Sequence, residues 1–283
     1  GGSGFIGLHF FEKLKKDSII NIDIDGGIKD LNHINCDITS VNELNAIDIS
    51  KHNDVTLIHL AAVHFDFQKG FFKTNVDGTK NILSFIKKNK NITHFVFFSS
   101  VATYGNSKDG KGENDKQSPI NDYGRSKLEA EQEIKLWHQK NQNVKTIIVR
   151  PAIVFGEYNF GNVYNLICQI KSGFFATIGK GQNIKSIAYA GNLVDSVFFA
   201  LKKVEKGRMF IYNYSDYPQM CITDQVNLIG ELLNRRVRFK IPYKVVKAIT
   251  TPIDIFEKIF KVDLIINSMR VEKFISPTYF KSD

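Results

Sequence analysis

Short apolar runs alternate with helix-forming segments through the first half of the chain. The apolar runs predict strands over residues 18–22, 55–58 and 94–98, with a further short strand ending over residues 35–38. The segments between them predict helices over residues 8–16, 75–88 and 128–137. This alternation indicates an α/β fold with a doubly wound parallel sheet. Ligands of such sheets bind beyond the carboxyl ends of the strands, so the residues that follow each strand matter most for function.

The first seven residues form a glycine-rich loop in front of a predicted helix. Gly1, Gly4 and Gly7 have the spacing G-x-x-G-x-x-G, which permits a tight turn and a close backbone approach to a pyrophosphate. Asp23 ends the next strand, 22 residues after Gly1, near the spacing of about 20 for a carboxylate that holds the adenosine ribose. A carboxylate there would repel a 2′-phosphate, which favours NAD over NADP. A solvated turn at Asp23 and Asp25 is the alternative.

A tyrosine and a lysine, Tyr123 and Lys127, stand four residues apart at the start of a predicted helix. At this spacing two side chains share a helix face, so the lysine charge should lie beside the phenol and lower the pKa of the phenol. Such a tyrosine could act as general base toward an alcohol. Ser100 ends a strand and would lie at the same edge of the sheet. An ordinary exposed helix start and a hydroxyl bonded to nearby backbone are the alternatives.

Composition and charge narrow the classes of partner. The chain has 283 residues, of which 43% are hydrophobic and 24% charged, as is ordinary for a soluble globular protein, and its net charge is +9. The basic residues are spread widely without a dense run, so a nucleic-acid partner is not expected. Cys36, Cys168 and Cys221 are far apart and indicate neither a disulfide framework nor a metal site, which suits a reducing cytoplasm.

Taken together, the motifs resemble the extended short-chain dehydrogenases/reductases of the NAD-dependent epimerase/dehydratase family. The shared segments, in the family's order, are GGSGFIG, Asp23, Cys36-Asp37-Ile38, HLAA, NVDGT, SSVATYG, YGRSK and Arg150-Pro151 through Gly156. The resemblance implies a Rossmann fold, an NAD cofactor and a catalytic trio of Ser100, Tyr123 and Lys127. Ser100 and Tyr123 would also contact the substrate.

The same resemblance implies a set of cofactor contacts. The pyrophosphate would be held by Gly1, Gly4, Phe5 and Ile6, the ribose by Asp23, and the adenine by Asp37 and Ile38. The remaining cofactor contacts would be Leu60, Ala61, Ala62, Ser99, Tyr123, Lys127, Pro151 (near the nicotinamide) and Ile153. Asn75 would brace the cofactor site through backbone contacts, and a helix N-cap is its alternative role.

Some residues depart from the family pattern. Val101 and Ala102 stand where the family's 4,6-dehydratases carry Asp-Glu, so no acid–base pair is available there for the elimination of water. Ile153 and Lys185 stand where many members carry Asn and Arg, at positions that would grip a nucleotide sugar. These differences argue against a dehydratase and against the usual mode of binding uridine diphosphate.

After Gly156 the chain becomes rich in amides and aromatics over residues 157–165. Amides can both donate to and accept from sugar hydroxyls and acetamido groups, which makes Asn162 and Asn165 candidate substrate contacts, and Lys185 could meet a diphosphate. A polar loop and a surface lysine are the alternatives. The change predicts an NAD-binding domain over residues 1–156, to which the chain returns around 184–203, and a mainly substrate-binding domain over 157–283.

Two further stretches carry expectations. A glycine loop of this kind normally follows a strand, so a central first strand is expected before Gly1 and is missing from this sequence; residues 1–283 alone are expected not to fold stably. Residues 241–262 combine apolar residues with lysines and predict two helical pieces divided by Pro252. Such a basic amphipathic segment could lie in a membrane interface, or could cover the substrate domain.

The second half narrows the resemblance to bacterial surface-polysaccharide enzymes that interconvert N-acetylglucosamine and N-acetylgalactosamine on undecaprenyl diphosphate. The segments that carry it lie within residues 155–189 and at Tyr212-Asn213-Tyr214. The resemblance implies a cytoplasmic NAD-dependent sugar 4-epimerase acting on a diphosphate-linked sugar in surface polysaccharide or O-antigen synthesis. Peripheral contact with the inner face of the plasma membrane and a homodimer are left open. A UDP-sugar 4-epimerase, a 4-keto-sugar reductase and a non-catalytic NAD-sensing scaffold are the alternatives.

Overall fold

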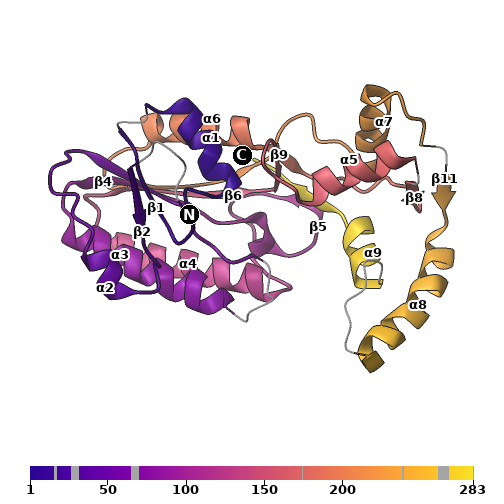
Figure 1. The fold of residues 1–283 in the computed structure, drawn as a ribbon, viewed down its shortest axis with the longest axis horizontal. Coiled ribbons are helices and arrows are strands. Elements are labelled where there is room, and N and C mark those ends of the chain that lie inside the picture. The colour runs from indigo at the N-terminus through magenta and orange to yellow at the C-terminus, as the bar shows by residue number, and fades with distance from the viewer. Residues whose placement is uncertain are drawn as a thin grey trace.

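A parallel sheet covered by helices on both faces occupies one end of the molecule, and a smaller group of helices occupies the other (Figure 1). The computed structural model describes residues 1–15, 18–26, 32–64, 70–173, 175–237, 239–260 and 268–282. The predicted α/β fold is confirmed. The predicted division near residue 156 stays a prediction.

Six parallel strands build the sheet end of the molecule. Four of them pair in the order β10-β6-β4-β3, and β1 pairs with β2 in a separate sheet. The strands are β1 (Ile20–Asp23), β2 (Asn32–Asn35), β3 (Val55–His59), β4 (Ile92–Phe98), β6 (Lys145–Pro151) and β10 (Met209–Tyr214). Strand β10 lies outside the segment 184–203 that was expected to return to this end, so the sheet draws on more of the second half than predicted.

The glycine loop lies between the two sheets. The nitrogen of Gly1 donates a hydrogen bond to the carbonyl of Ile22 on β1 at 2.7 Å, and Gly1 also packs on the backbone of Leu60 and Ala61, which follow β3. Within the described residues no ladder joins β1 to β3. The loop therefore lies at the carboxyl ends of strands from both sheets, where a doubly wound fold binds its ligand.

Strand β4 shows why the sheet needs a helix layer on each face. Alternate side chains of a strand point to opposite faces. Phe95 and Phe97 pack in one apolar cluster with helices α3 (Gly78–Lys88) and α4 (Asp122–Gln139), near α2 (Val41–Asn45). Val96 and Phe98 pack in a second cluster with α1 (Phe5–Lys13) and α6 (Ala190–Lys203). Both faces of β4 are thus buried, as is typical of a central parallel strand.

Helix boundaries follow local capping. Helix α4 begins at Asp122 because the side chain of Asn121 accepts a hydrogen bond from the backbone of Gly124 at 2.8 Å. Tyr123 and Lys127 consequently both lie within the first turns of an 18-residue helix. Helix α1 begins at Phe5, directly after the glycine loop and earlier than the predicted start at residue 8.

Segments of the second half other than β6, α6 and β10 form the other end of the molecule around an apolar cluster of Ile170, Phe175, Ile222 and Val226. Its helices are α5 (Asn162–Ser172), α7 (Ile222–Leu232), α8 (Tyr243–Phe260) and α9 (Ser268–Ile275). Three short parallel pairs accompany them: β8 (Ala176–Ile178) with β11 (Phe239–Ile241), β7 (Ile153–Phe155) with β9 (Ile187–Tyr189), and β5 (Ser107–Lys111) with β12 (Thr278–Phe280).

The expected break at Pro252 is wrong, because Pro252 lies inside the single helix α8. Proline removes one backbone donor, which normally weakens a helix. Here helix α9 holds α8 on both sides of the proline: the Thr250 hydroxyl is hydrogen-bonded to the Ser268 hydroxyl at 2.8 Å, and Asp254 accepts from the Ser268 backbone at 2.9 Å. Residues 261 and 262 of the predicted segment lie outside the described residues. None of the described helices is long and apolar enough to cross a membrane.

Helix α4 offers a test of the packing. Ile134 is wholly buried, whereas Leu136 on the same helix is 60% exposed. We expect Ile134→Ala to lower the free energy of unfolding by about 2–5 kcal/mol, because it leaves a cavity between α4 and the sheet. Leu136→Ala should change it by no more than about 0.5 kcal/mol. Urea unfolding of full-length protein measures both, and equal losses would contradict this packing.

Candidate active site

The three motif glycines of the loop differ in how much room the protein leaves for a side chain. A Cβ on Gly1 would lie 2.2 Å from the nitrogen of Ala61, and a Cβ on Gly7 would lie 1.9 Å from the carbonyl oxygen of Gly2. Both positions are therefore closed by the protein itself. Gly4 differs, because its backbone is in an ordinary extended conformation and, within the part of the chain that the structure describes, a Cβ there would meet only the Gly1 carbonyl, at 3.5 Å. The space beside Gly4 is left for a group from outside the chain.

The start of α1 suits an anion in that space. Phe5 and Ile6 are the first residues of α1, and the backbone N–H groups of a first turn have no partner within their helix. The positive end of the helix dipole adds to their attraction for negative charge. The predicted pyrophosphate contacts Gly1, Gly4, Phe5 and Ile6 thus lie together around one helix N-terminus.

Asp23 is part of the same loop assembly and is 8% exposed. One carboxylate oxygen accepts from the backbone of Ser3 at 2.8 Å, and the other accepts from the backbone of Ile24 at 2.8 Å. The carboxylate is therefore fixed against the glycine loop, where the sequence placed a ribose contact, and is not a solvated side chain. Ser3 was missed by the sequence analysis, since only its place inside the loop could have signalled it.

The two residues expected to hold adenine have separate environments. Asp37 is half-buried, and one of its carboxylate oxygens accepts from the backbone of Thr39 at 2.8 Å. The side chain of Ile38 is buried in the core, and a Cβ on Gly78 would lie 2.6 Å from its end. The carbonyl of Ile38 accepts from the side chain of Asn81 at 3.0 Å, so among the described groups of Ile38 the backbone N–H is left to contact a base.

Asn75 joins the loop after β3 to helix α4. It lies in the short π-helix η2 (Lys73–Asp77), which runs directly into α3, and is 1% exposed. Its side-chain oxygen accepts from the backbone of Val63 at 2.9 Å, and its nitrogen donates to the Val63 carbonyl at 3.0 Å and to the Ser126 hydroxyl at 2.9 Å. Asn75 therefore braces the segment that contains Leu60, Ala61 and Ala62, and it does not cap a helix.

The hydroxyl of Ser100 faces the phenol of Tyr123 closely enough to favour the phenolate and so to lower the pKa of Tyr123. Ser100 follows β4 and precedes the turn η3 (Val101–Tyr104), and its hydroxyl also accepts from the backbone of Ala102 at 3.1 Å. The backbone-bonded role and the catalytic role of Ser100 are thus compatible. Two hydroxyls meet at the carboxyl end of a central strand, as required to polarise an alcohol or a carbonyl.

Lys127 lies beneath this pair and is 2% exposed. Its ammonium donates to the carbonyl of Phe98 at 2.8 Å and lies 4.8 Å from the centre of the Phe97 ring. Burial lowers the pKa of Lys127 to about 7, although the carboxylate of Glu131 opposes that change. Lys127 therefore changes its charge near neutral pH.

The expectation that Lys127 lowers the pKa of Tyr123 is wrong for this state of the protein. Burial raises the pKa of Tyr123, and the hydroxyl of Ser100 offsets that rise only in part. Helical spacing does place the two residues on one face. The ammonium of Lys127, however, is bonded to the Phe98 carbonyl on β4.

The remaining predicted residues are distributed along the edge of the sheet and beyond it. The hydroxyl of Ser99 donates to Glu131, and its backbone nitrogen donates to the carbonyl of Val149 at 2.8 Å. Pro151 ends β6 and Ile153 begins β7. Asn162 and Asn165 are exposed on the first turn of α5, and neither is hydrogen-bonded to the trio within the described residues. Lys185 is 7% exposed, so it is not the surface lysine of the alternative interpretation.

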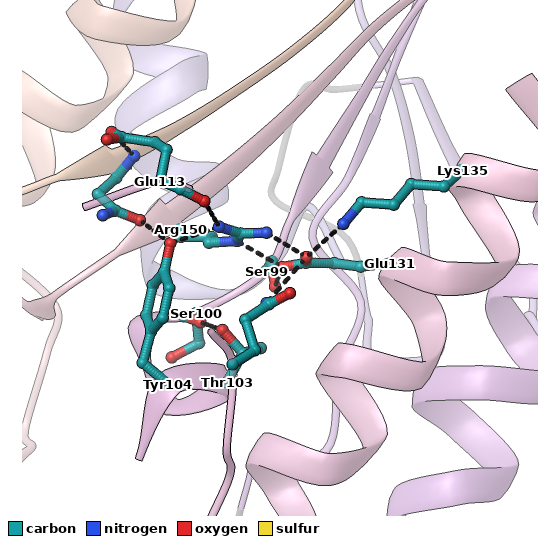
Figure 2. A network of polar contacts seen from close by, with 10 residues as sticks. Ser99, Ser100, Thr103, Tyr104, Glu113, Glu131, Lys135 and Arg150 are labelled. Atoms are coloured by element: carbon teal, nitrogen blue, oxygen red, sulfur yellow. Dashed lines mark hydrogen bonds and ion pairs between the residues drawn. The ribbon is translucent and has the colours of Figure 1, made fainter. Parts of the chain in front are cut away.

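A buried network beside the trio was missed by the sequence analysis (Figure 2). Glu131 and Arg150 form an ion pair at 2.7 Å, with side-chain exposures of 0% and 2%. The signal was present in part: Tyr123, Lys127 and Glu131 follow at steps of four along one helix face. The sequence analysis named Arg150 only as part of a family motif and gave it no role. The residues next to Arg150 along the chain do not indicate that it has a buried partner.

A model of the NAD dependent epimerase/dehydratase family matches residues 1–214. The chain belongs to the NAD-dependent epimerase/dehydratase family. It is 35% identical to the N-acetyl-alpha-D-glucosaminyl-diphospho-ditrans,octacis-undecaprenol 4-epimerase of Escherichia coli O157:H7, over 99% of this chain and 85% of that protein. It is 26% identical to the UDP-glucose 4-epimerase of Vibrio cholerae, over 70% of this chain and 63% of that protein.

Solved structures of similar fold support the architecture. The UDP-glucuronic acid 4-epimerase from Bacillus cereus in complex with NAD superposes with a TM-score of 0.71 at 21% identity, over 86% of each chain. The Thermus thermophilus UDP-glucose 4-epimerase complex with NAD superposes with a TM-score of 0.70 at 18% identity, over 86% of this chain and 85% of that one. Membership of an NAD-dependent family confirms the expected cofactor.

The glycine loop leads to a binding test. We expect Gly4→Ala to fold normally, because the protein leaves room for its methyl group, and to weaken NAD binding by at least about tenfold, because that methyl group occupies the space a pyrophosphate needs. Calorimetric titration with NAD and thermal unfolding measure the two effects. Gly7→Ala is the contrasting variant, since its methyl group collides with the Gly2 backbone and should destabilise the fold. Unchanged NAD affinity in Gly4→Ala would contradict the assignment.

Proposed function

We propose that the protein is a sugar 4-epimerase that uses NAD and acts on an N-acetylhexosamine joined through a diphosphate to undecaprenol. The observation that carries the proposal is the pairing of the Ser100 hydroxyl, at the end of β4, with the phenol of Tyr123, whose pKa it lowers. Support comes from the 35% identity, over nearly the whole chain, to a protein named for that 4-epimerase activity. The intact trio speaks against a non-catalytic NAD-sensing scaffold.

In this proposal Tyr123 removes the proton from the sugar 4-hydroxyl while Ser100 hydrogen-bonds the same oxygen. Gly1, Gly4, Phe5, Ile6 and Asp23 would hold NAD, which would supply a reversible hydride acceptor for the sugar carbon, so that no external reductant would be consumed. Because burial raises the pKa of Tyr123, formation of the phenolate needs positive charge nearby. Lys127 does not lower the pKa of Tyr123 in the ligand-free protein, and in this proposal its ammonium, protonated below a pKa of about 7, supplies that charge in the complex with substrate.

The residues after Ser100 favour epimerisation over dehydration. Val101 is buried and apolar, and Ala102 contributes only its backbone to the hydroxyl of Ser100. Elimination of water from a sugar requires a second acid and base beside the tyrosine. Neither Val101 nor Ala102 can supply a proton or accept one.

The far end of the molecule supports a lipid-linked substrate. On helix α8, Val245 is 47% exposed and Ile249 is 58% exposed, one turn apart. Lys244 and Lys247 are exposed on the same helix, which lies at the edge of the molecule farthest from the sheet (Figure 1). Exposed apolar residues flanked by lysines suit the surface of an anionic bilayer. Contact there would bring the enzyme to a diphosphate sugar carried by a membrane lipid.

The tyrosine provides the main test of the chemistry. We expect Tyr123→Phe to lower kcat by about 10²- to 10⁴-fold, because the general base is lost, while NAD affinity stays within about twofold. Interconversion of the two N-acetylhexosamines without added NADH is the measurement. Tyr217→Phe, at a 93% exposed tyrosine, is the control and should retain activity. Wild-type turnover that consumes NADH stoichiometrically would indicate a 4-keto-sugar reductase.

The carrier is tested by offering two substrates side by side. We expect kcat/KM to be higher for undecaprenyl-diphosphate N-acetylglucosamine than for UDP-N-acetylglucosamine, and the protein to sediment with anionic vesicles. The double variant Val245→Ser/Ile249→Ser should weaken vesicle binding at least about tenfold, since burial of one such side chain contributes ~1.5 kcal/mol or more.

Two exposed apolar residues at the sheet end serve as the control for that experiment. Leu136 is 60% exposed and Phe199 is 64% exposed, so Leu136→Ser/Phe199→Ser should leave vesicle binding unchanged. A much higher kcat/KM for the UDP-sugar, without sedimentation on vesicles, would refute the lipid-linked substrate and leave the 4-epimerase activity standing.

A further inference from the structure

A fully buried carboxylate, Glu131, lies one helical turn beyond Lys127. Arg150 binds it through two parallel hydrogen bonds, from Nε to Oε1 at 2.9 Å and from Nη2 to Oε2 at 2.7 Å. The hydroxyl of Ser99 donates to Oε1, and Gln117 donates to Oε2 at 3.1 Å. Figure 2 shows Ser99, Arg150 and Lys135 around Glu131, with the Lys135 ammonium 3.9 Å from Oε2. The carboxylate thus links α4 to the ends of β4 and β6.

The guanidinium of Arg150 extends the network away from Glu131. Nη1 donates to the hydroxyl of Tyr104 and to the carbonyl of Glu113, the latter at 3.1 Å. Tyr104 in turn donates to the side chain of Asn213 on β10 at 2.9 Å. The backbone nitrogen of Asn213 donates to the Glu113 carboxylate at 2.6 Å. One chain of contacts therefore spans α4, β4, β6, β10 and the turn η3.

The ion pair of Glu131 and Arg150 lies against the segments that carry the reacting groups. A buried ion pair is weak evidence for stability, because apolar residues of the same volume often stabilise a core equally well. This pair, however, contacts the segments that carry the reacting groups. Ser99 precedes Ser100, and the carbonyl of Phe98, one residue earlier, holds Lys127. Any shift of Glu131 would move these groups relative to Tyr123.

We propose that Glu131 and Arg150 are positioning residues, which hold Ser100 and Lys127 in line with Tyr123 and keep a negative charge one helical turn from the lysine. The inference rests on the proposed function only in assigning the proton transfer to Tyr123. The contacts that carry it are independent of the sugar and of its carrier.

The other groups that face Lys127 do not supply such a charge. From β3 and the loop that follows it come His59 and His64. Burial and the charge of Lys127 lower the pKa of both histidines, that of His59 well below its ordinary value, so both are neutral near pH 7. Tyr123 is protonated near pH 7, since its pKa is raised. Arg150 is hydrogen-bonded to Glu131 and is positively charged. Glu131 is the group that raises the pKa of Lys127.

Loss of the Glu131 charge should lower the pKa of Lys127. Without Glu131 the pKa of Lys127 falls further, and the lysine loses its proton at lower pH. Activity that needs the protonated lysine disappears as pH rises through this pKa. The alkaline limb of kcat therefore moves to lower pH.

The test compares three variants of the full-length protein. In Glu131→Gln we expect kcat to fall about 10- to 100-fold with little change in KM or NAD affinity, because misplacement of a reacting group slows the chemical step. The alkaline limb should move to lower pH. Glu131→Gln/Arg150→Met removes both charges and should recover the stability of the wild type. It should recover neither the wild-type kcat nor the wild-type position of the alkaline limb. Glu129→Gln, at an exposed glutamate of the same helix, is the control and should match wild type.

A second readout is independent of turnover. NMR titration of the Lys127 ammonium in substrate-free protein should give a lower pKa in Glu131→Gln than in wild type. If the wild type epimerises no sugar, the proposed function fails while this titration still decides the role of Glu131. If the Glu131 variants do not fold, Ser99→Ala decides, because it removes only the link between the pair and the end of β4 and should lower kcat. Wild-type kcat and pH profile in the double variant, or in Ser99→Ala, would overturn the proposal.

Discussion

The active-site end of the fold depends on the hydrogen bond from the Lys127 ammonium to the carbonyl of Phe98. A fully buried cation is unfavourable unless polar partners replace water. Here the carbonyl of Phe98, the ring of Phe97 and the carboxylate of Glu131 replace water around the Lys127 ammonium. The same bond ties helix α4 to the central strand. The position of Tyr123 relative to Ser100 is thereby set by the environment that Lys127 needs in order to be buried.

The glycine loop shows a comparable division between what the fold needs and what a ligand needs. Gly1 and Gly7 are closed by neighbouring backbone, so they serve the packing of α1 against the rest of the sheet end. Gly4 is restricted neither by its conformation nor by a neighbour. A family that binds NAD accounts for this third glycine, because a pyrophosphate must approach the backbone closely at the start of α1.

The two ends of the molecule contribute different parts of the proposed activity. In the proposed function, the sheet end carries the groups that move a proton and hold the cofactor. Short, buried hydrogen bonds join these groups to their neighbours. The other end carries α5 and α8, whose amides, lysines and apolar residues are exposed. In the proposed function, these exposed residues would recognise the sugar and its lipid carrier, and the buried groups of the sheet end would carry out the proton transfer.

The sequence by itself determined the features that depend on local spacing: strands β1, β3 and β4, helices α1, α3 and α4, the glycine loop, Asp23 at a strand end, and Tyr123 with Lys127 on one helix. Apolar periodicity and glycine spacing are properties of a few neighbouring residues, so they can be read without a fold. Only the tertiary structure decided the direction of the Lys127 ammonium, the raised pKa of Tyr123, the partnership of Glu131 with Arg150, and the continuity of α8 through Pro252. Each of these depends on burial and on a partner distant in sequence, which no local pattern encodes.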